Sequence, residues 1–181
     1  MNEVRIIGGD LRGRKIQFPS VVGLRPSLDA VRETLFNWLM FKVHDAVCLD
    51  AFAGSGALGF EALSRGASRV IFIEKEPQVI RALKQTQQRF KLESKSEIYQ
   101  GIALPQNGAF DLIFLDPPFG QNLLTEALLT IAEMKLLKPE GLVYFEAEKN
   151  LNLSLYLGQH WQIYRHKKMG ELQFGLLETF C

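Results

Sequence analysis

Short apolar runs alternate with segments of helical periodicity through most of this chain, and this alternation restricts the possible folds more than any other feature. The apolar runs predict strands over Ala46–Ala51, Arg69–Glu74, Glu97–Gln100, Phe110–Leu115 and Leu142–Glu146. Apolar residues at helical spacing predict helices over Leu58–Ser64, Pro77–Phe90 and Leu123–Leu136. Consecutive strand–helix units form a parallel sheet with helices on both faces and right-handed crossovers.

The C-terminal part of the chain loses helical periodicity. It predicts two antiparallel strands, Gln162–Lys168 and Gln173–Phe180, around a turn at Gly170. Together with the preceding strands, they predict one doubly wound α/β domain. Its sheet is mostly parallel and seven-stranded, and it ends in an antiparallel hairpin.

The N-terminal part predicts a small β-hairpin, Val4–Ile7 and Arg14–Phe18, followed by a loop over residues 19–26. Ser27 is then expected to cap a helix that continues to about Phe41. We therefore divide the chain into an N-terminal extension, residues 1–26, and a main domain, residues 27–181.

Composition excludes several classes of protein. The chain has 181 residues and only two cysteines, Cys48 and Cys181, too few for a disulfide framework, so we expect a reducing cytoplasm. The histidines His44, His160 and His166 have no metal-ligand spacing, so no metal site is predicted. No apolar stretch reaches membrane-spanning length, so no membrane partner is expected.

Basic residues gather in two places although the net charge is only +1. One is the run Arg165–Lys168. The other is the N-terminal extension, which has two acids, Glu3 and Asp10, and five basic residues: Arg5, Arg12, Arg14, Lys15 and Arg25. Such clusters either neutralise phosphates or form ordinary solvated surface.

A glycine-rich loop follows the first strand of the main domain. Asp50 ends the strand, Gly54 and Gly56 permit backbone conformations with positive φ, and Glu74 ends the next strand. A carboxylate at that position binds ribose hydroxyls, so the unit predicts an adenosine-like ligand. The spacing Gly54-x-Gly56-x-x-Gly59 also fits a nicotinamide dinucleotide. The Asp50 charge opposes a pyrophosphate, however, and favours the cationic sulfonium and amino groups of S-adenosyl-L-methionine.

An acid, two prolines and an aromatic residue, Asp116-Pro117-Pro118-Phe119, follow the apolar run that ends at Leu115. Ligands of open α/β sheets bind beyond such strand ends. A carboxylate and a backbone carbonyl there can accept hydrogen bonds from a planar amine while the aromatic ring stacks on it. The alternative is a turn punctuated by prolines.

With these motifs in this order, the chain resembles the Rossmann-like S-adenosylmethionine-dependent methyltransferases. It is most similar to the bacterial 16S ribosomal RNA guanine-N2 methyltransferase family (RsmD-like). The similarity extends over nearly the whole chain and includes Arg5-Ile6-Ile7-Gly8-Gly9, Leu24-Arg25-Pro26, Val31–Leu39, Asp50–Gly59, Glu61–Arg65 and Asp116–Phe119.

The resemblance implies a role for each motif. Phe52, Ala53, Gly54 and Gly56 would contact the methionine part of the cofactor with Asp50, and Glu74 would hold its ribose. Asp116, Pro117 and Phe119 would form the target-amine site, with Asp116 as general base. The basic N-terminal residues would contact 16S ribosomal RNA, within the small ribosomal subunit, and we expect a monomer. At the expected adenine-binding position Ile102 replaces a small polar residue.

Three alternatives remain open at this stage. The glycine loop also suits a nicotinamide-dependent oxidoreductase. A methyltransferase of this fold could act on DNA adenine or on a protein amide. A non-catalytic RNA-binding module would have no need for both an intact Asp116 and an intact glycine loop.

Overall fold

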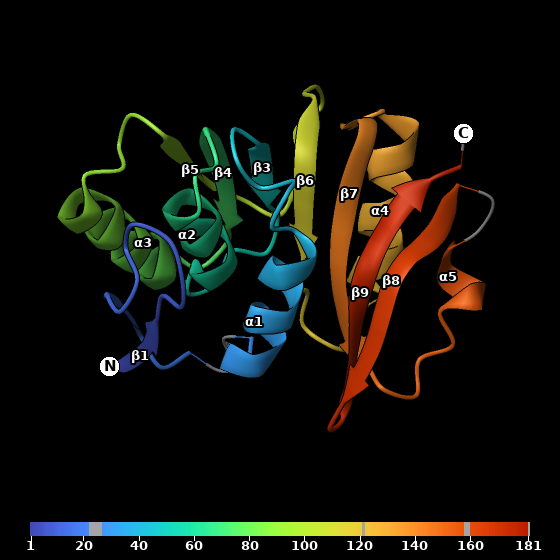
Figure 1. The fold of residues 1–181 in the computed structure, drawn as a ribbon, viewed down its shortest axis with the longest axis horizontal. Coiled ribbons are helices and arrows are strands. Elements are labelled where there is room, and N and C mark those ends of the chain that lie inside the picture. The colour runs from blue at the N-terminus through green and yellow to red at the C-terminus, as the bar shows by residue number, and fades with distance from the viewer. Residues whose placement is uncertain (22–26, 121, 158–159, 181) are drawn as a thin grey trace.

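The computed structural model describes residues 1–21, 27–120, 122–157 and 160–180 (Figure 1). A two-stranded hairpin comes first, and the strands and helices of the main domain then alternate. In chain order the elements are β1 (Asn2–Arg5), β2 (Lys15–Phe18), α1 (Asp29–Trp38), β3 (Val47–Asp50), α2 (Ala57–Ser64), β4 (Arg69–Glu74), α3 (Pro77–Phe90), β5 (Ser96–Gln100), β6 (Phe110–Leu115), α4 (Leu123–Glu133), β7 (Leu137–Glu148), α5 (Ser154–Leu157), β8 (Trp161–Met169) and β9 (Leu172–Thr179).

The main sheet, as far as the described residues show it, is seven-stranded in the order β5-β4-β3-β6-β7-β9-β8. The strands from β3 to β7 pair in parallel, whereas β9 runs antiparallel to both β7 and β8. The predicted doubly wound sheet with a C-terminal antiparallel hairpin is therefore confirmed.

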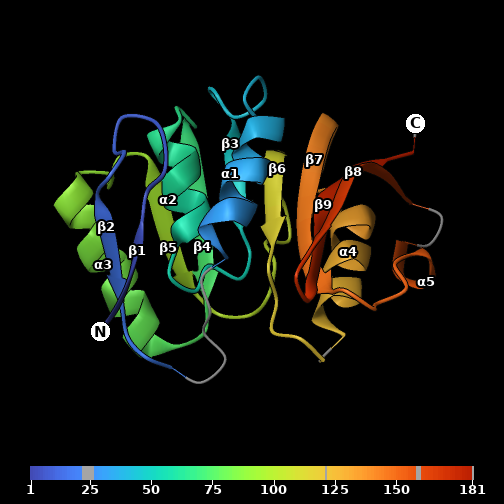
Figure 2. The same ribbon diagram turned by 60° about the horizontal axis from the view of Figure 1, so that its bottom comes forward.

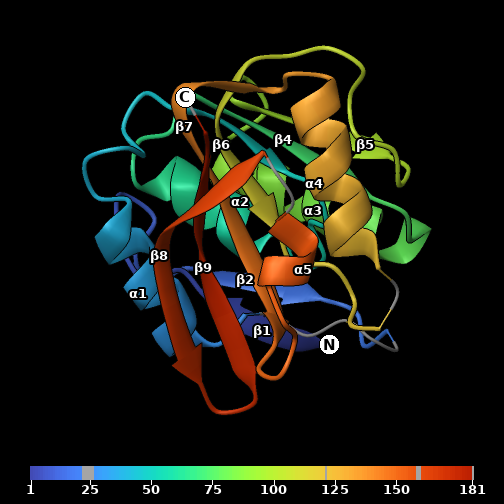
Figure 3. The same cartoon turned by 90° about the vertical axis from the view of Figure 1, so that its right-hand side faces the viewer.

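Helices cover both faces of the sheet, and each face has its own core. Buried residues of α1, α2 and α3 pack with alternate strand residues such as Cys48 and Phe114. Residues of α4 pack on the opposite face with the neighbouring strand residues Leu49 and Ile113. Successive strand side chains point to opposite faces, which explains the division. Figure 3 shows α1 on one side of the sheet and α4 with α5 on the other.

β7 is longer than the predicted strand Leu142–Glu146, because it already begins at Leu137. Phe110 of β6 pairs with Leu137, and the next pair joins Leu112 to Leu142, so the intervening residues of β7 form a bulge. Pro139 lies in that bulge, where its lack of an N–H group costs no ladder hydrogen bond.

The prediction that Ser27 caps the first helix is wrong. The N-cap residue of α1 is Leu28, and no side chain caps the helix. Because the helix starts one residue later than a Ser27 cap requires, the Ser27 hydroxyl instead donates to Oδ2 of Asp116 at 3.2 Å. Two helices also end earlier than predicted: α1 ends at Trp38, before a turn, and α4 ends at Glu133.

The N-terminal hairpin packs against the main domain (Figure 2). Its buried apolar side chains share one core with α1, α2 and α3: Val4, Ile6, Ile16 and Phe18. The loop between β1 and β2 lies at the C-terminal end of α2, where Asp10 N–H donates to Ser64 O at 2.8 Å. Gly9 has φ +76° there, and a Cβ would meet Ser64 O at 1.8 Å. Since α2 begins at the carboxyl end of β3, this loop lies at the opposite, amino-terminal edge of the sheet.

A buried carboxylate on α2 holds the chain just after β1. Oε2 of Glu61 accepts the Ile7 N–H and Oε1 accepts the Gly8 N–H, both at 2.8 Å. Arg65 also donates to Oε1 at 2.8 Å. These contacts satisfy backbone donors that the hairpin ladder leaves unpaired.

A buried arginine on α1 completes this cluster. Arg32 and Glu61 have no exposed side-chain surface, and Arg32 Nη1 lies 3.6 Å from Glu61 Oε2. Arg32 Nη2 donates to Arg5 O at 2.9 Å and to Asp29 Oδ1 at 2.6 Å. The cluster therefore joins α1, α2 and the hairpin.

We expect Glu61→Gln to reduce the free energy of unfolding by roughly 3–5 kcal/mol, because it leaves the buried Arg32 guanidinium without its buried counter-ion. Urea unfolding followed by circular dichroism measures this change. The control is Glu33→Gln, which neutralises an exposed acid of the same charge on α1. Equal stabilities of the two variants would contradict the role of Glu61.

Candidate functional site

Carboxyl groups end four neighbouring strands at one edge of the sheet. Asp50 ends β3, Glu74 ends β4, Asp116 follows β6, and Glu146 lies near the end of β7. The chain runs outward from β3 to β4 and β5, then crosses back to β6 on the other side of β3. The strand order thus reverses between β3 and β6, which is where open α/β sheets bind ligands.

The glycine loop after β3 is held by the acids on either side of it. Gly56 has φ +78°, and a Cβ there would meet Leu83 at 2.6 Å and Phe60 at 2.7 Å. Asp50 Oδ2 accepts the Gly59 N–H at 3.0 Å, and Glu74 Oε2 accepts the Gly54 N–H at 2.9 Å. The loop therefore turns tightly between the two carboxylates, and only glycine suits its sharpest bend.

Asp50 lies in an environment that disfavours its charge. Its side chain is 2% exposed, and burial raises the pKa of Asp50 from 3.8 to about 7. The Gly59 hydrogen bond opposes this rise in pKa, and the nearby Glu74 charge adds to it. A cationic ligand group beside Asp50 would compensate for the buried negative charge.

The residues of the tetrapeptide after β6 differ in their exposure to solvent. Pro117 is buried, Asp116 is half-buried and the Phe119 ring is 43% exposed. Loss of hydration is the main reason that the pKa of Asp116 lies well above its ordinary value, and the negative charges of Glu146 and Asp50 raise it further. The hydrogen bond from Ser27 opposes this rise. The acid therefore holds protons more firmly than a surface aspartate.

Sequence reasoning did not identify two polar residues of β7 beside this tetrapeptide. Glu146 is 3% exposed, and the Tyr144 hydroxyl donates to its Oε1 at 2.7 Å. The one signal in the sequence is a single acid within the apolar stretch Val143–Ala147, which an ordinary buried strand would not contain.

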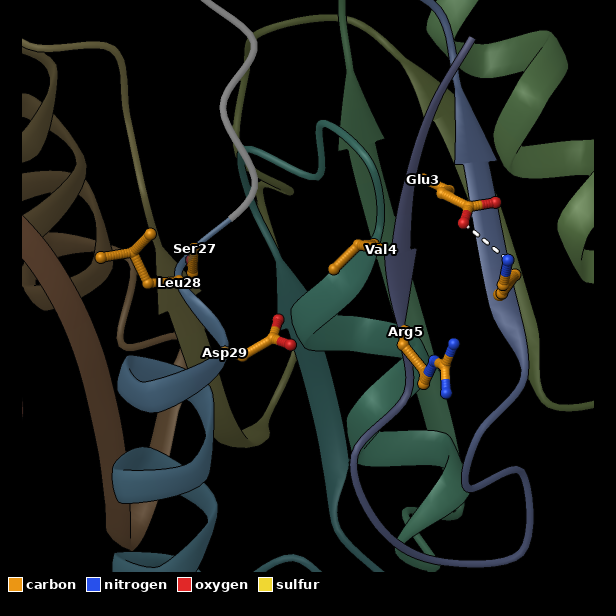
Figure 4. Close-up of a pocket in the computed structure, with 7 residues that line it drawn as sticks. Glu3, Val4, Arg5, Ser27, Leu28 and Asp29 are labelled. Carbon is orange, nitrogen blue, oxygen red and sulfur yellow. Dashed lines mark ion pairs between the residues drawn. The ribbon is translucent and has the colours of Figure 1, made fainter.

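The predicted RNA-contact residues do not lie together. Arg5 and Lys15 line a groove that extends to Ser27 and Asp29 at the start of α1 (Figure 4). Lys15 also pairs with Glu3 at 2.7 Å.

Two other basic residues of the hairpin lie toward the amino-terminal edge of the sheet. Arg12 is exposed in the loop at the amino-terminal edge, and the Arg14 guanidinium lies 4.3 Å from the centre of the Phe90 ring at the end of α3. Arg25 lies outside the described residues.

The basic run on β8, in contrast, lies level with the carboxylates. Lys167 pairs with Phe174, which pairs with Glu146. Lys168 lies one residue further in the same direction, and both lysines are exposed. Strand spacing of about 4.8 Å places this row roughly 14 Å from β6.

The structure offers no metal-binding cluster of three or more His, Cys, Asp or Glu side chains within the ranges it describes. Over the same ranges, none of the helices is both long enough and apolar enough to cross a membrane. After β5, Ile102 points its side chain into solvent, and the preceding Gly101 N–H binds Glu74 O at 2.9 Å.

Comparison with known proteins decides the family. Residues 4–178 match the family described as Conserved hypothetical protein 95. The ribosomal RNA small subunit methyltransferase D of Haemophilus influenzae is 44% identical, over 98% of this chain and 94% of that protein. The protein of the same name from Escherichia coli K12 is 40% identical, over 97% and 90%. The chain belongs to this family, the RsmD family.

Solved structures of other proteins share the fold of this RsmD-family chain. A protein of Escherichia coli described as a methyltransferase has a TM-score of 0.87 and 39% identity, and 98% of each chain is covered. A Haemophilus influenzae protein described as a methylase has a TM-score of 0.83 and 42% identity, with 99% of each chain covered. The predicted family and enzyme class, a methyltransferase, are confirmed. The individual site residues stay predictions.

We expect Asp50→Asn to flatten the pH dependence of stability in this RsmD-family protein between about pH 4 and pH 7. The folded-state pKa of Asp50, about 7, exceeds the ordinary value of 3.8. The folded state therefore holds a proton that the unfolded state has released, so this stabilisation is complete at low pH and lost as pH rises through 7. Asparagine still accepts the Gly59 N–H. At pH 8 the free energy of unfolding of the variant should exceed that of wild type by roughly 2–4 kcal/mol.

Urea unfolding at several pH values measures this difference. Asp45→Asn is the control, because it makes the same change at an exposed aspartate. Parallel stability curves for wild type and Asp50→Asn would show that the pKa of Asp50 is not raised.

Proposed function

We propose that this protein transfers a methyl group from S-adenosyl-L-methionine to the exocyclic N2 of a guanine in 16S ribosomal RNA. The observation that carries the proposal is the meeting of two elements where the strand order reverses: the Asp50 glycine loop after β3 and the Asp116 tetrapeptide after β6. Membership of the RsmD family and the names of its curated members support the choice of a ribosomal RNA substrate.

The residues at this edge fit S-adenosyl-L-methionine better than a nicotinamide dinucleotide. The ligand brings an electrophilic methyl group on a sulfonium, an amino acid and a ribose, but no phosphate. Acids end the strands around the glycine loop, and the negative charges of neighbouring carboxyl groups raise the pKa of both Asp50 and Asp116. Such a field attracts the cationic groups and repels a pyrophosphate. Asp50 would face the cationic end and Glu74 the ribose, with Phe52, Ala53, Gly54 and Gly56 between them.

The tetrapeptide would orient and activate the target amine. The guanine N2 hydrogens would donate to the Asp116 carboxylate and to the Pro117 carbonyl, which favours a pyramidal and more nucleophilic nitrogen. Phe119, with its exposed ring, would stack on the base, an interaction worth about 1–3 kcal/mol. Holding the amine in line with the methyl group supplies much of the rate, because correct orientation can contribute roughly 7–11 kcal/mol.

Asp116 would also act as the general base. The N2 nitrogen loses a proton as its bond to the methyl carbon forms, and Asp116 lies beside it to accept that proton. The target base has to leave its stack to reach a crevice of this kind. We therefore expect an unpaired or extruded guanine of the small ribosomal subunit as the substrate.

RNA phosphates would lie on either side of the carboxylates. On one side Arg5 and Lys15 line the groove that reaches Ser27 (Figure 4). On the other side Lys167 and Lys168 of β8 lie level with Glu146. Arg12 and Arg14, at the amino-terminal edge, would contact only RNA that extends past the hairpin.

We expect Asp116→Ala to reduce methyl transfer by about 10²–10⁴-fold, since the general base and an acceptor for the amine are both lost. The assay incubates the variant with labelled cofactor and small ribosomal subunits from a strain lacking the gene, then maps the labelled nucleotide. Calorimetry should show S-adenosylhomocysteine bound with affinity near wild type, and NAD not bound.

Asp10→Ala, at an exposed acid of the hairpin loop, is the matched control and should keep full activity. Wild-type turnover by Asp116→Ala would remove Asp116 from the mechanism. Binding of NAD in preference to S-adenosylhomocysteine would favour an oxidoreductase instead.

We expect Arg5→Ala to weaken RNA binding and to lower the slope of log affinity against log salt by about 1, because one phosphate contact is lost. The Arg5 carbonyl still accepts from Arg32, so the fold is preserved. Filter binding of a small-subunit RNA fragment at several salt concentrations gives the slope. Arg12→Ala, on the same hairpin, should change the slope less. A larger effect at Arg12 would place the RNA at the far edge.

A further inference from the structure

Two carboxyl groups of neighbouring strands meet beside the proposed target-amine site. Leu115 of β6 pairs with Phe145 of β7, so the next residues, Asp116 and Glu146, lie side by side at the strand ends. The Ser27 hydroxyl donates to Asp116 Oδ2 at 3.2 Å, and its proximity also lowers the pKa of Glu146. One hydroxyl therefore lies near both acids.

Among the described residues, which do not include Arg25, the groups around this pair provide no counter-charge for it. From β7, Tyr144 donates to Glu146 Oε1 at 2.7 Å. From β3, the Asp50 carboxylate adds a further negative charge. From α1, the nearest charged residue to Ser27 in the sequence is Asp29, which already pairs with Arg32 at 2.6 Å.

Simultaneous ionisation of two carboxyl groups in this position is disfavoured. Glu146 is 3% exposed, so water solvates its charge poorly. Like charges at close range disfavour a second ionisation, as in dyads of acids that share one proton. Loss of hydration raises the pKa of both groups, and the negative charge of Glu146 raises the pKa of Asp116 further.

We propose that Asp116 and Glu146 hold one proton between them, and that Glu146 is a positioning residue that takes this proton and so leaves Asp116 ionised as the base of the reaction. The inference rests on the proposed methyl transfer for its catalytic part only. The sharing of the proton is a property of the protein without substrate.

The proton balance of the step follows. The N2 lone pair forms the bond to the methyl carbon, and the carbon–sulfur bond breaks with its electron pair moving to sulfur. The methylated nitrogen is then cationic and passes one proton to the ionised carboxylate, Asp116. The pair, which began with one proton, now holds two and returns one to solvent after the product leaves. Because Glu146 carries the first proton, Asp116 stays ionised at a pH where a lone buried acid would be protonated, and it can therefore accept the proton of the amine.

The test is a titration of the carboxyl groups by NMR, on full-length protein labelled with ¹³C at the Asp and Glu carboxyl carbons and without ligand. Wild type should show two coupled steps for Asp116 and Glu146, separated by more than about one pH unit. In Glu146→Gln, Asp116 should titrate in a single step that lies between the two steps of the pair. The acidic limb of the kcat profile should move to higher pH with it, so that kcat at neutral pH falls.

Glu148→Gln is the matched control, because it removes an exposed acid two residues further along β7 and should leave both measurements unchanged. Tyr144→Phe is a second probe that keeps both acids. It removes the donor to ionised Glu146, so the upper titration step should move to higher pH.

An unchanged Asp116 titration in Glu146→Gln would overturn the proposal, as would an unchanged upper step in Tyr144→Phe if the first variant does not fold. The proposed function fails differently. If the coupled steps appear but ribosomal subunits gain no methyl group, the acid pair stands and the methyl transfer to this RNA does not.

Discussion

The accumulation of negative charge at one edge of the sheet is the constraint on which the rest of the site depends. Asp50, Glu74, Asp116 and Glu146 end four adjacent strands, and parallel pairing brings them together whatever the loops do. Burial makes such charges costly unless a cation or a proton compensates for them. Two compensations are available: a cationic cofactor beside Asp50, and a proton between Asp116 and Glu146. The edge is thus suited to a sulfonium donor and to an acceptor that releases a proton.

A second buried group of charges, Arg32 with Glu61 and Arg65, has a different role. It is compensated within the protein, and it ties β1 to α1 and α2. Because Ser27, which contacts Asp116, lies two residues before α1, the cluster also helps to fix the position of that hydroxyl. The hairpin is therefore connected to the site through the start of α1, although its loop lies at the far edge of the sheet.

The sequence was sufficient to predict the fold and the elements that carry Asp50, Glu74 and Asp116, because period-two and helical patterns are local and strand ends mark the ligand edge. It was not sufficient for contacts between distant segments. Serine is a residue type typical of helix N-caps, yet the Ser27 hydroxyl donates to an acid 89 residues away. Glu146 looked like part of an apolar strand, since its partner Asp116 is adjacent only through the β6–β7 register. The bulge at Pro139 likewise depends on pairing with β6.

The distribution of charge also explains how a protein of net charge +1 can handle an RNA substrate. Phosphates are repelled by the acids at the strand ends, and only a base, which is uncharged, can approach them. For the proposed function, basic residues would therefore be useful on the flanks: Arg5 and Lys15 beside Ser27 on one side, Lys167 and Lys168 on the other. Binding the backbone on two flanks while the centre excludes phosphate would favour extrusion of the nucleotide between them, with its base in the acidic crevice. The same charge pattern thus disfavours a dinucleotide cofactor and, in the proposed function, would help to present the guanine amine.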